Sequence, residues 1–184
     1  MGNLRGVLLR EARGMLEEGQ PLHLRALAAR AGITAGSMYH HYESKTELLG
    51  ELAAGGFKEL RQDLEAADRV AAATGTRLRS WAATYFRFAQ REPSLFALMF
   101  DPEVAHLEPV AEARAATLAV LHAVVAEVSA AQGRVDPPLD QITLAIWAAA
   151  HGTATLGPTA ATGQAELVDE VIVGLDALFR GPRS

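Results

Sequence analysis

The chain has 184 residues, of which 49% are hydrophobic and 21% charged, an ordinary composition for one globular domain or a small domain fused to a larger one. The absence of cysteine excludes a disulfide framework and a thiolate zinc site. No apolar run reaches the roughly 20 residues that a membrane-spanning helix needs. The first six residues also lack a signal-peptide core. The sequence therefore predicts a soluble cytoplasmic protein with no membrane partner.

The net charge of −5 is unevenly distributed along the chain. Residues 1–48 carry six basic and five acidic residues, which leaves eleven basic and seventeen acidic residues for the remainder. A near-neutral N-terminal segment on an acidic body can still dock on a DNA duplex, because local charge decides such contacts. The asymmetry is compatible with DNA binding but does not establish it.

The N-terminal segment is predicted to form three helices. Alanine-rich apolar periodicity with few β-branched runs favours helices nearly throughout the chain. Gly32 is expected to close the second helix in a left-handed cap. Thr34 is expected to cap the third by accepting a hydrogen bond from a free backbone N–H. The predicted ranges of these helices are 4–16, 24–31 and 35–41.

The rest of the chain is also predicted to be helical. The capping box Ser44-Lys45-Thr46-Glu47 indicates the start of a long helix that ends near Ala73. Later helices are delimited by glycine and proline, and their predicted ranges are 77–91, 93–100, 108–132, 139–156 and 166–180. We therefore predict an all-α fold of about nine helices, with a three-helix head followed by a helical-bundle body.

The segment 24–42 has the pattern of a helix-turn-helix. Ala28 is small where two helices must cross closely, and Gly32 suits the tight turn. Ile33 and Met38 are expected to close a miniature core. This spacing alone is only moderately specific, since many helical hairpins share it.

A longer match makes the interpretation specific. The run from Leu24 to Leu49 contains Tyr39-His40-His41-Tyr42 and, after two further residues, Lys45. It resembles the DNA-binding domain of the TetR family, and the resemblance includes the first helix. It implies a helix-turn-helix DNA-binding domain over 1–48 and a helical ligand-binding and dimerisation domain over 49–184.

The resemblance assigns phosphate contacts to the positions of Thr34, Tyr39, His41 and Lys45. Hydroxyl and imidazole groups can donate hydrogen bonds to phosphate oxygens. Lys45 lies in the first turn of a capped helix, where free backbone N–H groups also attract anions. The alternative is a buried Tyr39 with a solvated pair of histidines, His40 and His41. For an isolated histidine pair that alternative would be preferred.

Direct reading of base edges is expected to be sparse. The residues expected to face the major groove are Ala35, Gly36, Ser37 and His40. None can make the bidentate contacts that discriminate best between bases, so we predict that DNA shape carries much of the specificity, with Arg25 as an additional contact. His23 stands where relatives often have a capping serine or threonine, so the cap of the second helix is in question.

The body carries two further stretches of resemblance, 81–100 and Trp147-Ala148-Ala149-Ala150-His151-Gly152. Both are similar to TetR-family members whose regulatory domain is named for a Trp-His-Gly signature. An aromatic stripe is more often core than ligand pocket, but a regulator needs a cavity with a few polar anchors. The candidate ligand-binding residues are Tyr85, Phe88, Phe96, Met99, His122, Trp147 and His151.

Two apolar seams suit helix packing. One follows the positions Ile142, Ile146, Ala149, Thr153 and Leu156, and the other lies in the helix predicted at 166–180. The resemblance implies that these last two helices pair with their twins in a homodimer, which places two heads on a palindromic DNA operator. Alternatively, both seams serve the protomer core.

The implied function is a ligand-responsive one-component transcription regulator, foremost a repressor that binds its operator as a dimer and is released by a small, largely apolar effector. A ligand-dependent activator or co-repressor fits the sequence equally well. A helical interaction module that has lost DNA binding is the other alternative, favoured by the sparse base-reading set and opposed by the phosphate-binding residues. We expect no metal site or cofactor.

An enzyme is the remaining class. The segment Glu103-Val104-Ala105-His106 has the Glu-x-x-His spacing of di-iron carboxylate proteins, but that chemistry needs a second such motif on another helix. Neither His122 nor His151 has a glutamate three residues before it. Motifs typical of zinc proteases, serine hydrolases and phosphate-binding loops do not occur. The sequence therefore predicts a protein that is not an enzyme.

Overall fold

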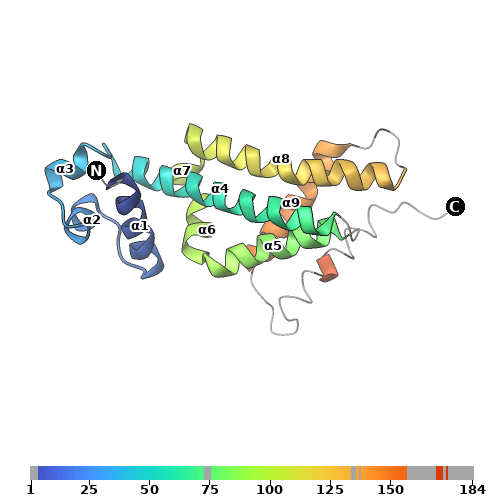
Figure 1. Ribbon diagram of the computed structural model, residues 1–184, viewed down its shortest axis with the longest axis horizontal. Coiled ribbons are helices and arrows are strands. Elements are labelled where there is room, and N and C mark those ends of the chain that lie inside the picture. The colour runs from blue at the N-terminus through green and yellow to red at the C-terminus, as the bar shows by residue number, and fades with distance from the viewer. Residues whose placement is uncertain are drawn as a thin grey trace. The chain divides into compact units, whose positions relative to one another are not determined.

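The computed structural model describes residues 4–72, 76–133, 136, 138–156, 169–171 and 173. Within these ranges the backbone is helical and forms no strand (Figure 1), which confirms the all-α prediction. The helices with defined bounds in this part of the chain are α1 (Leu4–Glu17), α2 (Leu24–Arg30), α3 (Ala35–Tyr39), α4 (Lys45–Ala71), α5 (Arg77–Arg91), α6 (Pro93–Met99), α7 (Pro102–Ala105), α8 (Glu108–Ala131) and α9 (Leu139–Leu156).

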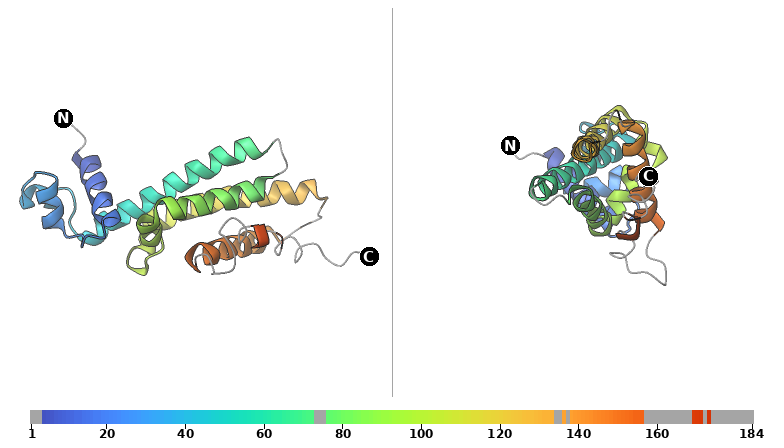
Figure 2. Two further views of the ribbon diagram at one scale, coloured as in Figure 1. Left: turned by 90° about the horizontal axis from the view of Figure 1, so that it is seen from below. Right: turned by 90° about the vertical axis from the view of Figure 1, so that its right-hand side faces the viewer.

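The contacts within the chain divide it into two compact units. The first unit comprises Met1–Glu59 and Arg91–Ala115, and the second comprises Leu60–Gln90 and Ala116–Ser184. Helices α4 and α8 each contribute to both units, and Figure 2 shows α4 as one uninterrupted helix. The domain boundary expected after residue 48 follows the sequence motif, and it stays a prediction.

The turn between α2 and α3 is closed as predicted. Gly32 has a φ of +69°, a conformation that only glycine adopts without strain. Its N–H donates to the carbonyl of Ala29 at 3.2 Å, and the N–H of Ile33 donates to the carbonyl of Ala28 at 2.9 Å. This pair of bonds is a Schellman motif, and it satisfies carbonyls that the end of α2 would otherwise leave unpaired.

The caps of α2 and α3 differ. The side-chain oxygen of Thr34 accepts a hydrogen bond from the N–H of Ser37 at 3.1 Å, which confirms the predicted cap of α3. This helix ends at Tyr39, two residues earlier than predicted. His23 occupies the N-cap of α2 in extended backbone and makes no capping hydrogen bond, as its departure from the family pattern indicated.

Helix α4 begins at the predicted capping box, with one difference. The hydroxyl of Ser44 accepts the N–H of Glu47 at 3.0 Å, as the motif requires. The carboxylate of Glu47 accepts the N–H of Glu43 at 2.8 Å, one residue before the cap. Both bonds fix the chain direction at the junction between the helix-turn-helix and α4.

Close packing in the first unit depends on glycines of α4. A Cβ at Gly56 would lie 2.8 Å from the sulfur of Met99, and one at Gly50 would lie 2.6 Å from Leu107. One residue after Gly56, the ring of Phe57 meets that of Phe100 edge-on at 5.3 Å. Large side chains from residues 91–115 therefore cover α4 where it lacks side chains of its own.

The short helix α7 was missed by the sequence reading. Asp101 caps it, accepting the N–H of Glu103 at 2.8 Å, and Pro102 occupies the first turn. Aspartate at the N-cap with proline after it is a recognisable helix start. The signal was present in the sequence, although the helix is only four residues long.

In the second unit, helices are joined by a charged cluster and by apolar packing. The guanidinium of Arg77 on α5 donates to Asp68 of α4 at 2.6 Å and also pairs with Glu127 of α8. Of the described helices, α8 alone is long and apolar enough to cross a membrane, although its apolar stretches are interrupted by polar and charged residues such as Glu112, Arg114 and Glu127. Leu121 and Val124 are buried inside the unit, as in a core helix of a globular protein.

The helix predicted at 166–180 lies mostly outside the described residues. Residues 169–171 and 173 are helical, and Asp169 pairs with Arg79 of α5 at 2.7 Å.

Candidate nucleic-acid interface and effector site

The predicted DNA-binding side chains lie on the surface of the first unit. Tyr39 is 50% exposed, whereas Tyr42, three residues later, is 1% exposed. The alternative of a buried Tyr39 is therefore wrong. The other predicted contacts are exposed or half-buried, namely Arg25, Thr34, Ala35, Gly36, Ser37, His40, His41 and Lys45.

This exposure follows from the way α3 packs on α2. Met38 is fully buried, as is Leu27 of α2, and Ala28 is 2% exposed. Because Met38 points into this miniature core, its neighbours along α3 face outward. The packing roles predicted for Ala28 and Met38 are thereby confirmed.

Three of the predicted contacts line one open groove of about 500 Å³: Arg25 from α2, Tyr39 from the end of α3 and Lys45 from the start of α4. The groove is completed by His23, Leu24, Glu43 and Ser44. A guanidinium, a phenol hydroxyl and an ammonium together form a donor set suited to a phosphate. The first turn of α4, with its free N–H groups, lies at the same place.

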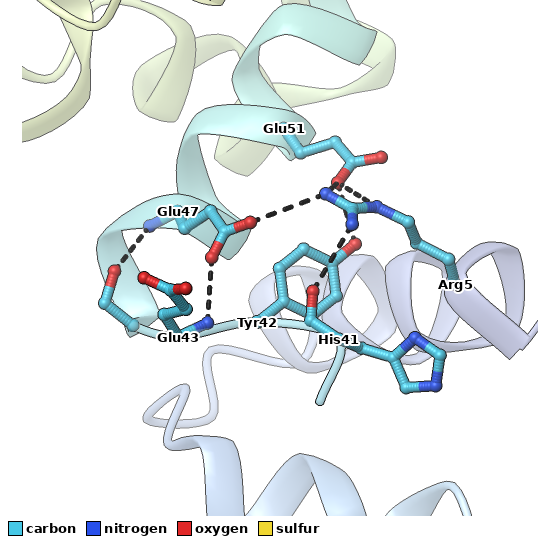
Figure 3. Close-up of polar contacts among 7 residues, drawn as sticks. Arg5, His41, Tyr42, Glu43, Glu47 and Glu51 are labelled. Atoms are coloured by element: carbon cyan, nitrogen blue, oxygen red, sulfur yellow. Dashed lines mark hydrogen bonds and ion pairs between the residues drawn. The ribbon is translucent and has the colours of Figure 1, made fainter. Parts of the chain in front are cut away.

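A polar network behind this surface holds the segment between α3 and α4 (Figure 3). Arg5 of α1 donates to the carboxylate of Glu51 at 2.7 Å and to the carbonyl of His41 at 3.3 Å. Its guanidinium lies 4.6 Å from the centre of the Tyr42 ring. One side chain of α1 thus restrains the backbone that carries a predicted phosphate contact.

The same network fixes the charge states of its members. The hydroxyl of Tyr42 donates to Glu51 at 2.9 Å, and burial together with this bond raises the pKa of Tyr42. Burial also raises the pKa of Glu51, but the hydrogen bonds from Arg5 and Tyr42 outweigh it and the net pKa is lowered. Glu51 is therefore an anion at neutral pH and anchors both donors. Sequence reasoning missed this network, because Arg5 and Glu51 are 46 residues apart.

Three of the predicted effector-binding residues meet in the second unit. The indole N–H of Trp147 donates to the hydroxyl oxygen of Tyr85 at 3.3 Å, and that hydroxyl lies 3.1 Å from Nδ1 of His151. Because the indole can only donate, the Tyr85 oxygen accepts from it. In the bond between Tyr85 and His151, donor and acceptor depend on which ring nitrogen of His151 carries the proton.

Both titratable members of this cluster are neutral at physiological pH. Burial lowers the pKa of His151 and raises the pKa of Tyr85. Trp81 extends the cluster, because its ring stacks on Tyr85 with centroids 5.2 Å apart and planes 17° apart. The arrangement is a polar but uncharged patch between α5 and α9.

The other predicted effector residues lie elsewhere. Phe88 is fully buried in the second unit. The side chain of His122 is 42% exposed, and its Nε2 lies 3.2 Å from Asp140. Phe96 and Met99 are buried in the first unit. The structure thus joins Tyr85, Trp147 and His151, and the remaining assignments stay predictions.

The predicted seam of α9 turns partly inward. Ile142 is 7% exposed and Thr153 is 8% exposed within the protomer, so these two positions serve its core. The outward face of α9 contains Leu144, which is 60% exposed, together with Ala145 and Ala148. This second face is therefore the more accessible of the two to a partner of α9.

Comparisons with known proteins agree with this geometry. The family model described as bacterial regulatory proteins, tetR family, matches residues 9–52. The model described as tetracyclin repressor-like, C-terminal domain, matches residues 78–172. No curated protein matches the chain. The Trp-His-Gly subtype stays a prediction.

Solved structures match over nearly the whole chain. A protein of unknown function from Rhodococcus sp. RHA1 is 31% identical, with a TM-score of 0.82 over 100% of this chain and 97% of that one. A tetR-family regulatory protein from Rhodococcus RHA1 is 20% identical, with a TM-score of 0.69 over 96% and 97%. The regulator FadR from Bacillus subtilis, solved with stearoyl-CoA, is 14% identical, with a TM-score of 0.73 over 97% and 99%.

Together the two family models match the N-terminal helix-turn-helix segment and most of the body, over residues 9–52 and 78–172. Two of these neighbours are described as regulators. The chain belongs to the TetR family of bacterial transcription regulators.

Proposed function

We propose that the protein is a cytoplasmic one-component repressor that binds a palindromic operator as a homodimer and leaves it when a small, largely apolar effector binds to the body. The observation that carries this proposal is the exposed groove shared by Arg25, Tyr39 and Lys45. A solvent-facing aromatic that lines one groove with two cations suits a phosphate backbone better than a protein core.

The remaining head residues support phosphate contact with limited base reading. The oxygen of Thr34 already accepts the N–H of Ser37, so its hydroxyl hydrogen is the part that can reach a phosphate. Ala35 and Gly36 have no polar side-chain group. Specificity would therefore come from single bonds by Ser37 and His40, from a methyl contact by Ala35 and from DNA shape.

A second copy of the chain is the proposed partner of α9. Its outward residues Leu144, Ala145 and Ala148 combine one large apolar side chain with two small ones, which allows close helix approach. With the helix predicted at 166–180, this face would complete a dimer. Two reading heads would then reach successive half-sites of a palindrome.

The body is proposed to hold the effector near Tyr85, Trp147 and His151. The neighbour FadR was solved with stearoyl-CoA, which supports a small molecule with an apolar part as the class of effector. Effector binding is proposed to shift α4 and thereby change the spacing of the heads. Coupling free energies of this kind are about 1–3 kcal/mol.

The test is selection of duplexes from a random pool with three proteins at one fixed salt concentration, because salt alone changes such affinities strongly. These are the wild type, Tyr39→Ala and the control Val70→Ala, which alters another exposed side chain. A palindromic site should be enriched by the wild type and the control and lost with Tyr39→Ala. No enrichment by the wild type, with or without cell extract as a source of effector, would contradict operator binding and favour an interaction module.

The same operator serves to test the direction of regulation. Release of the wild type by an extract or compound supports the repressor proposal. Tighter binding with that compound would instead assign the protein as a ligand-dependent activator or co-repressor. That function would use the same DNA-binding and effector-binding residues.

Dimerisation is tested separately with Leu144→Arg, which places a charge on the outward face of α9. We expect a folded monomer by light scattering, with operator affinity reduced because only one head binds at a time. An unchanged dimer would contradict the assignment of this face.

A further inference from the structure

Two buried polar atoms among the described residues have no hydrogen-bond partner. They are the indole nitrogen of Trp81 and the hydroxyl oxygen of Thr143. Trp81 is 3% exposed and Thr143 is 2% exposed. Native proteins pair nearly all such atoms, so each unpaired one calls for an explanation.

Both atoms flank the polar cluster already described. Trp81 lies one turn before Tyr85 on α5 and stacks on its ring. Thr143 lies one turn before Trp147 on α9, on the same helical face. The Tyr85 hydroxyl bonds to both Trp147 and His151, so the residues with the two unpaired atoms each lie one helical turn from a member of this cluster, on two different helices.

We propose that Trp81 and Thr143 contact the effector, and that the effector is an uncharged, largely apolar molecule with a carbonyl-type hydrogen-bond acceptor, as in a ketone, ester, lactone or amide. This inference rests on the proposed function and adds the chemical class of the ligand. An indole N–H can only donate, so the ligand atom beside Trp81 must be an acceptor. The Thr143 hydroxyl donates or accepts and therefore tolerates either kind of second group.

The absence of charge follows from the neighbours of these atoms. Among the described residues, the polar groups of the cluster are two indoles, a phenol, a hydroxyl and an imidazole, and burial keeps the phenol and the imidazole neutral. A charged ligand group placed here would lose its hydration without meeting an opposite charge within the cluster. A neutral carbonyl avoids that cost.

The first part of the test needs no ligand. Thr143→Val removes the unpaired hydroxyl and keeps the side-chain shape. The matched control is Thr153→Val on the same helix, because Thr153 is also buried but donates to the carbonyl of Ala149 at 2.7 Å. We expect a higher Tm for Thr143→Val than for Thr153→Val. Equal or lower Tm for Thr143→Val would show that its hydroxyl is already paired and would overturn the proposal.

The second part uses medium-chain methyl ketones, each paired with the n-alkane of equal length. The chain has two tryptophans, so a proton–nitrogen NMR spectrum shows two indole signals, which Trp147→Phe assigns. We expect a ketone of the series to shift the Trp81 signal downfield relative to its alkane. Trp81→Phe and Thr143→Val should each weaken binding of that ketone by about fivefold, the effect of one lost hydrogen bond, whereas Thr153→Val should not.

If every ketone shifts the Trp81 signal no more than its alkane, the inference is overturned. Operator selection is also carried out with Trp81→Phe. It distinguishes failure of the proposed ligand class from failure of the proposed repressor function. A recovered palindrome without ketone discrimination leaves the repressor standing and removes the effector class. Absence of any operator for the wild type removes the repressor, while a ketone-specific indole shift would still support the binding site.

Discussion

The DNA-facing surface and the effector cluster are organised in opposite ways. Arg25, Tyr39 and Lys45 lie close together in the sequence and are exposed at one groove. Tyr85 and His151 are 66 residues apart, and Tyr85 is fully buried. In the head, local caps fix the backbone and side chains project from it. In the body, function depends on which helices meet.

The difference teaches where functional residues are also structural ones. A side chain at the surface contributes little to folding, so it can be chosen for binding alone. A buried tyrosine of α5 whose hydroxyl bonds to two side chains of α9 contributes both to folding and to the proposed effector site. Mutations at the surface of the head should therefore change DNA binding without changing stability. Mutations in the buried cluster of the body should change effector binding and stability together.

The largest expected effect compares two tyrosines. Tyr85→Ala removes a fully buried ring and should lower the free energy of unfolding by about 3–5 kcal/mol. Tyr39→Ala should change it by less than about 0.5 kcal/mol while operator binding is lost. Chemical denaturation of both variants measures this. Similar losses for the two would break the contrast between the regions.

Adjacent glycines of α4 provide the next comparison. Gly56→Ala would place a Cβ 2.8 Å from the sulfur of Met99 and should destabilise the protein by about 1–3 kcal/mol. Gly55 has nothing within 4 Å of its would-be Cβ. Gly55→Ala should stabilise the protein by up to about 1 kcal/mol through helix propensity. Thermal unfolding of both variants should give Tm shifts of opposite sign, and shifts of the same sign would contradict this packing.

Local capping in the head predicts a smaller pair of effects. Thr34→Ala should cost about 1 kcal/mol, because the N–H of Ser37 loses its acceptor. His23→Ser should gain a similar amount by supplying the side-chain acceptor that α2 lacks. Both are measured as midpoints in urea. If His23→Ser destabilises the protein, the imidazole has a structural role that capping does not describe.

The smallest effects concern pH, and each region has its own window. His151 has a lowered pKa when folded, so the unfolded chain takes up its proton first and stability falls as pH drops below about 6.5. Glu51 also has a lowered pKa, and its contribution is complete above about 4.3 and lost as pH falls through the folded value. Unfolding free energies against pH should lose the upper decline in His151→Gln and the lower decline in Glu51→Gln. Unchanged profiles would contradict these assignments.

Sequence reasoning succeeded where the physical cause is local. The cap by Thr34, the left-handed turn at Gly32 and the start of α4 each depend on a few consecutive residues. The capping box predicted the bond between Ser44 and Glu47, but the second bond went to Glu43 because the motif does not determine which N–H the carboxylate reaches.

Contacts between distant residues of the body were not predictable in the same way. His122 is a candidate ligand-binding residue whose side chain is 42% exposed, with Nε2 3.2 Å from Asp140, a neighbour that the sequence pattern did not indicate. Trp81 lies in the stretch 81–100 that resembles the family, and neither Trp81 nor Thr143 is among the candidate ligand-binding residues predicted from the sequence. An unpaired polar atom is a property of the packed structure, since a single sequence does not specify which partners are missing.

Helices α4 and α8 each belong to both compact units, and this has a consequence for protein engineering. The helix-turn-helix motif ends near residue 48, but Phe100 and Met99, which cover α4 in the first unit, are supplied some fifty residues later. A chimeric regulator that joins residues 1–59, the motif with the first part of α4, to a foreign body would leave Phe57 without its natural cover. Grafts that also transfer residues 91–115 retain this packing, so a usable crossover follows contacts and not motif borders.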